Sequence, residues 1–143
     1  LCSIVHRELR RKMKRTNPLV DSEALTNPDH AVHDISALIS RVKSEATWKN
    51  RDRHAVTLTR TPGLHVTLIA MHAETSKPWH RVECPISIQV IEGRIDFITD
   101  TETKLLKQGD ILILPPGIRH HMKVLDESVI LLTLGATIGS RTP

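Results

Sequence analysis

The chain has 143 residues, 39% of them hydrophobic and 25% charged, which is typical of one globular domain and includes no apolar run long enough to span a membrane. Its net charge of +4 comes from the first 15 residues, where six basic side chains face one acidic one, so the other 128 residues sum to −1. With no basic face on the body and only one Phe, two Trp and no Tyr, we expect no nucleic-acid partner and no membrane association.

Residues 1–30 are expected to form a basic tail or arm ahead of a single domain at 31–143. Two Thr-Asn-Pro sequences, which disfavour regular secondary structure, interrupt this stretch, and Met13 is a plausible translation start. We therefore interpret residues 1–12 as upstream sequence with no role in the fold. The functional alternative is a basic arm that binds phosphate or anionic lipid.

The two cysteines, Cys2 and Cys84, lie far apart in the sequence. Two thiols do not make a disulfide framework, and the first residues have no apolar core of the kind found in a secretion signal. These features predict a reduced, cytoplasmic protein.

One helix is expected at 34–46. Asp34 can cap it by accepting a hydrogen bond from an amide of the first turn. The apolar residues then recur at the helical spacing i, i+3, i+4, i+7: Ile35, Leu38, Ile39 and Val42. Such a stripe predicts a helix packed against a sheet, without a catalytic role.

From position 55 the chain changes to short alternating segments separated by turn signals such as Glu92-Gly93 and Gln108-Gly109. Eight strands are predicted, at 55–60, 64–71, 86–91, 94–99, 104–107, 110–114, 121–125 and 128–134. This spacing indicates an all-β sandwich or barrel.

Residues 109–120 have the form G-x5-P-x-G-x2-H. Gly109 closes a hairpin where a positive φ is expected, Pro115 stops strand pairing, and Gly117 permits the turn that directs His120 inward. This segment resembles the second conserved motif of the cupin superfamily, and in particular small single-domain bacterial cupins. The resemblance implies a cupin double-stranded β-barrel, or jelly roll, with one N-terminal helix.

The first cupin motif has the form G-x5-H-x-H-x3,4-E-x6-G, and this chain keeps only part of it. Its closing glycine corresponds to Gly93, which places His80 on the first histidine. Val82 stands in place of the second histidine, Ile86 in place of the glutamate, and Glu74 in place of the opening glycine. Two of the three metal ligands of this motif are therefore lost.

The resemblance implies a pocket inside the barrel, lined by His80, Val82, Ile86, His120 and Met122. Two imidazoles rarely hold a first-row divalent ion without a third protein ligand, so we expect no tightly bound metal. A reduced site with a divalent metal, built from His80, His120 and either Glu83 or Cys84, is the alternative. A pocket that is half apolar with two polar groups is more typical of a small-ligand site.

Other histidines are expected to have no function. His121 should point away from His120 because neighbouring strand residues face opposite sides, and His65 and His72 should likewise lie on opposite faces. The resemblance also implies a homodimer, to which the outward-facing Ser87, Gln89 and Ile91 would contribute. No catalytic residue is predicted.

The leading functional hypothesis is a binding protein for an unidentified small molecule. A metal-dependent enzyme of the oxygenase or isomerase type, with a reduced ligand set, is the second. A structural dimer with a vestigial pocket is the third. The fold alone does not choose among them, since cupins host many unrelated functions.

Overall fold

The structure is a computed structural model that describes residues 31–136. Residues 1–30 and 137–143 lie outside the described residues. The predictions of a basic tail, of an upstream segment ending before Met13 and of a thiol at Cys2 fall on that part of the chain.

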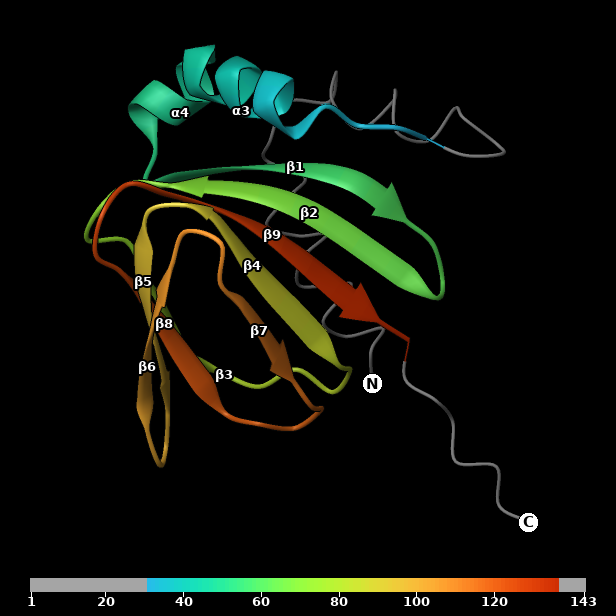
Figure 1. Ribbon diagram of the computed structural model, residues 1–143, viewed down its shortest axis with the longest axis vertical. Helices are drawn as coiled ribbons and strands as arrows, with labels where there is room; N and C mark the ends of the chain where they lie inside the picture. Colours follow the sequence, from blue (N-terminus) through green and yellow to red (C-terminus); the bar gives the residue numbers. More distant parts are fainter. Residues whose placement is uncertain (1–30, 137–143) are drawn as a thin grey trace.

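Two antiparallel sheets face each other and form an all-β jelly roll, as predicted. The first sheet has the order β1-β2-β9-β4-β7 and the second the order β3-β8-β5-β6. In Figure 1 the two sheets curl over one another around a shared interior. The strands are β1 (Arg53–Arg60), β2 (Leu64–Met71), β3 (Ser76–His80), β4 (Ile86–Glu92), β5 (Arg94–Thr99), β6 (Thr103–Lys107), β7 (Ile111–Leu114), β8 (His120–Val124) and β9 (Ser128–Gly135).

All eight predicted strands are present, with ends that differ by at most two residues. The sequence did not predict β3, which is one of the two edge strands of the four-stranded sheet. It contains Pro78, and its residues are mostly exposed, so it has no apolar alternation to detect. Proline is tolerated there because an edge strand has one row of amides that need no partner strand.

The predicted helix is present as α3 (Ile35–Ser44), and the Asp34 carboxylate accepts a hydrogen bond from the amide of Ala37 at 3.0 Å. A second short helix, α4 (Ala46–Asn50), follows after Glu45, whose backbone is extended. Neither helix of the described residues is long and apolar enough to cross a membrane. The carboxylate of Glu45 lies 2.7 Å from Nε2 of His54 on β1, which ties the helices to the sheet.

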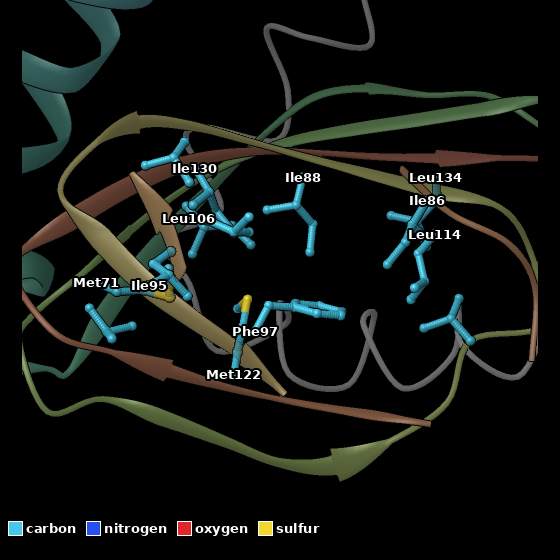
Figure 2. Close-up of a cluster of buried hydrophobic side chains, with 14 of the residues drawn as sticks. Met71, Ile86, Ile88, Ile95, Phe97, Leu106, Leu114, Met122, Ile130 and Leu134 are labelled. Atoms are coloured by element: carbon cyan, nitrogen blue, oxygen red, sulfur yellow. The ribbon is translucent and has the colours of Figure 1, made fainter. Parts of the chain in front are cut away.

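Two hydrophobic clusters lie on opposite faces of the five-stranded sheet. The outer cluster packs α3 and α4 against β1, β2 and β9, and it contains Ile39, Val42, Trp48, Val56, Leu58, Leu68, Ala70 and Val129. The inner cluster fills the space between the sheets; Figure 2 labels ten of its side chains, including Ile88 and Phe97. The helices therefore cover the outside of the barrel and leave its interior to the strands.

Candidate functional site

His120 is the first residue of β8 and is 3% exposed. The turn before it contains Gly117, which has a φ of 83° and donates its amide hydrogen to the carbonyl of Val82 at 2.8 Å. A positive φ costs a glycine little, so the Pro-Pro-Gly turn can direct the strand inward at this point. The expected inward orientation of His120 agrees with this burial.

His80 is the last residue of β3 and pairs with His120 across the two strands. Their ring centroids are 4.2 Å apart with an angle of 64° between the planes, an edge-to-face contact. His80 is exposed whereas His120 is buried. The pair therefore combines one imidazole in contact with solvent and one inside the barrel.

Backbone carbonyls fix the tautomers of both imidazoles. Nδ1 of His80 lies 3.0 Å from the carbonyl oxygen of Pro78, and Nδ1 of His120 lies 2.9 Å from that of Ile118. A carbonyl only accepts, so each Nδ1 carries a hydrogen and each neutral ring keeps its lone pair on Nε2. The Nε2 atom is therefore the acceptor nitrogen of each ring.

Phe97 on β5 stacks on the ring of His120, with centroids 5.0 Å apart. Burial is the main cause that lowers the pKa of His120, since it disfavours the charged ring. The hydrogen bond to Ile118 acts in the opposite direction, and the charges of His80 and Lys77 lower the pKa further. His120 is accordingly neutral at neutral pH.

The remaining residues of the expected pocket, Val82, Ile86 and Met122, all belong to the inner cluster and are at most 8% exposed. Hydrocarbon therefore occupies the two positions where the cupin motif has a histidine and a glutamate. Glu74, at the position of the opening glycine, has a φ of 67°. This is the left-handed conformation that glycine favours, as expected at the position of the motif's opening glycine.

A metal centre does not fit these residues. Within residues 31–136, no three side chains among the histidines, cysteines, aspartates and glutamates are grouped so that they could hold a metal ion. Cys84 is 1% exposed within the inner cluster, and a carboxylate oxygen of Glu83 lies beside the turn at Gly117. Neither forms a three-ligand group with the histidine pair. Two imidazoles alone are a poor ligand set for a first-row divalent ion.

A pocket of about 170 Å³, lined in part by Phe97, lies between β5, β6 and β7. Its lining comprises Phe97, Thr99, Glu102, Lys104, Leu112, Ile113 and Leu114. Of these residues, Thr99 pairs with His120 across neighbouring strands. Sequence reasoning missed this pocket, although strand alternation from Phe97 would have placed Thr99 on the same face.

Three other histidines contact nearby backbone or side-chain groups. His121 is half-buried, and its Nδ1 contacts the carbonyl of Lys77. His72 stacks on Trp48 of α4 with centroids 3.6 Å apart. His65 is 1% exposed and its Nε2 lies 3.3 Å from the hydroxyl of Thr67.

Residues 65–134 match the model of the Cupin domain family. A conserved protein of unknown function from Streptococcus pyogenes has a similar structure, with a TM-score of 0.60 and 20% identity over 78% of this chain and 93% of that one. A cupin-2 domain protein from Shewanella frigidimarina gives a TM-score of 0.60 at 15% identity, covering 73% of this chain and 94% of its own. KdgF from a Halomonas species gives 0.55 at 18% identity, covering 78% and 92%. No functionally curated protein matches the sequence.

Proposed function

This chain belongs to the cupin superfamily, and we propose that it binds a small molecule at the His80–His120 pair without a tightly bound metal. The observation that carries the proposal is the contact between two imidazoles of fixed tautomer, in a barrel whose buried hydrocarbon includes Val82 and Ile86. A mostly apolar cavity with a few converging polar groups is the usual form of a small-ligand site.

The two histidines would have different roles. His120 is buried and neutral, so its Nε2 would accept a hydrogen bond from a hydroxyl or amide of the ligand. His80 is exposed, so its ring would contact the part of the ligand nearest to solvent. Phe97 gives an apolar wall, because its ring stacks on His120 and also lines the neighbouring pocket.

We also propose that the protein is a homodimer. Edge strand β7 presents Ile111 and Ile113 at 57% and 65% exposure, directly beside Gln89 and Ser87 of β4. Large apolar side chains on an edge strand favour association with another sheet. Ile91, which was also expected at that contact, is partly buried against the outer cluster. Light scattering of the protein and of the Ile113→Lys variant tests this proposal: a monomeric wild type, or a variant that stays dimeric, would contradict it.

One observation favours the metal-dependent alternative. Metal-binding histidines commonly donate their second ring nitrogen to a carbonyl, as both imidazoles do here. An enzyme of this kind would need a third ligand from elsewhere, so the metal content of the native protein distinguishes the two functions.

Binding is tested by screening a library of small polar fragments against the full chain by NMR, with the ring signals of His80 and His120 as reporters. We expect fragments that shift both signals, and we expect the double variant His80→Gln, His120→Gln to lose them. His72→Gln is the matched control, because that ring stacks on Trp48 of α4. Fragments that bind the double variant as well as the wild type would contradict the proposal.

A further inference from the structure

A β-bulge in β1 turns a cationic side chain into the barrel. Thr57 pairs with Thr67, but Thr59 pairs with Val66, so one extra residue is inserted between them. Strand alternation without the bulge would leave Arg60 on the outer face. The bulge instead pairs Arg60 with His65, whose neighbours at alternating positions of β2 line the inner cluster. Arg60 is half-buried, and its Nε atom is out of contact with solvent.

A second cation faces the same interior from the opposite sheet. Lys77 on β3 pairs with Met122 on β8, which is 4% exposed and belongs to the inner cluster. Paired residues of an antiparallel ladder share a face, so Lys77 points inward like Met122. Its charge acts on the ring of His120. Lys77 therefore brings a positive charge to the histidine pair.

The strands contribute no negative charge to this interior. Only two of their residues are acidic, Glu92 and Asp96. Glu92 bonds to Lys43 of α3 at 2.7 Å, outside the barrel. Asp96 pairs with the exposed Lys123 and alternates with inward-facing neighbours on β5, so it faces outward as well. The inward positions of β1, β2, β3 and β8 instead carry the basic or imidazole side chains of Arg60, His65, Lys77, His80 and His120.

We propose that the ligand of the barrel is a small oxyanion, a carboxylic acid or a phosphate ester, attracted by Arg60 and Lys77. This inference rests on the proposed binding at the histidine pair and adds the chemical class of the ligand. Arginine and lysine are the usual partners of carboxylate and phosphate groups, and their attraction is stronger where water is excluded. Thr57 and Thr67, which pair with each other one row further along the same face, are buried polar side chains.

The test is an NMR titration of the full chain with sodium malonate and with inorganic phosphate at constant ionic strength, using the ring signals of His80 and His120. Neutral malonamide is the control probe. We expect at least one anion to saturate these signals, and Arg60→Gln and Lys77→Gln each to weaken its binding about tenfold. Lys123→Gln removes the same charge from the outer face and should change affinity less than about twofold.

Arg60→Lys keeps the charge, so a folded protein that retains most of the affinity would support the inference even if Arg60→Gln unfolds. Equal binding of malonamide and malonate would overturn the anion inference and leave the pocket intact. So would variants of Arg60 and Lys77 that bind like Lys123→Gln. If neither the anions nor malonamide moves the signals of the two histidines, the proposed binding function is wrong as well.

Discussion

Replacing Phe97 with alanine tests the link between the core and the histidine pair. The Phe97 side chain is 2% exposed, belongs to the inner cluster and stacks on His120 at 5.0 Å. Removing a buried phenyl ring costs about 3–5 kcal/mol through lost transfer energy and the cavity left behind. That is a large share of the ~5–15 kcal/mol by which domains are usually stable. Urea unfolding followed by circular dichroism should show the loss.

The same substitution should also change the titration of His120. Burial is the largest cause that lowers its pKa, and the missing ring would admit water from the pocket next to Phe97. We therefore expect the pKa of His120 to rise toward its ordinary value of 6.5. The Cε1 proton of the ring reports this in an NMR titration.

Leu68→Ala is the matched control. Leu68 is 1% exposed in the outer cluster, on the face of the five-stranded sheet away from His120. Its loss should cost a comparable ~2–5 kcal/mol of unfolding free energy and leave the pKa of His120 unchanged. If Phe97→Ala does not move the pKa, or Leu68→Ala moves it equally, burial by Phe97 does not control the titration.

Three further predictions concern the site and its frame. Folding lowers the pKa of His120, so the unfolded chain takes up more protons than the folded chain below about pH 6.5. The free energy of unfolding should therefore fall from pH 7 to pH 5, and it should fall less steeply in His120→Gln. Equal pH slopes of the wild type and the variant in urea unfolding would contradict this. Gly93→Ala should destabilise the fold by at least ~2 kcal/mol, and by more than Gly109→Ala. Both glycines have a φ near +90°, but a new Cβ at Gly93 would lie 2.1 Å from a neighbouring hydroxyl, whereas nothing lies within 4 Å at Gly109. Thermal unfolding of the two variants ranks these costs. Restoring ligands with Val82→His and Ile86→Glu should raise zinc affinity, measured by calorimetry, by more than about tenfold, since even groups that only hydrogen-bond to the metal ligands contribute that much. An unchanged affinity would show that these two positions do not face the histidine pair.

Much of the frame could be predicted from the sequence because its signals are local. Gly109 and Gly117 have the positive φ values of 91° and 83° that tight turns favour, and each marks a turn in the printed sequence. The Asp34 cap and the apolar stripe of α3 are equally local. The alternation of β4 correctly placed Ile86 toward the interior.

The missed features depend on partners that the sequence does not identify. A bulge is defined by two residues opposite one, so the inward turn of Arg60 requires knowledge of the pairing with β2. The contact of Phe97 with His120 joins neighbouring strands far apart in the chain. Helix α4 is only five residues long, and Trp48 is buried in it by tertiary packing rather than by a periodic pattern.

Elemental analysis of the native full chain, purified without a histidine tag or chelator, tests most directly whether the histidine pair is a ligand pocket or a metal centre. The two-imidazole site predicts far less than one equivalent of iron, manganese or zinc per chain. A full equivalent that disappears in both His80→Gln and His120→Gln would contradict the ligand-pocket function and establish a metal centre.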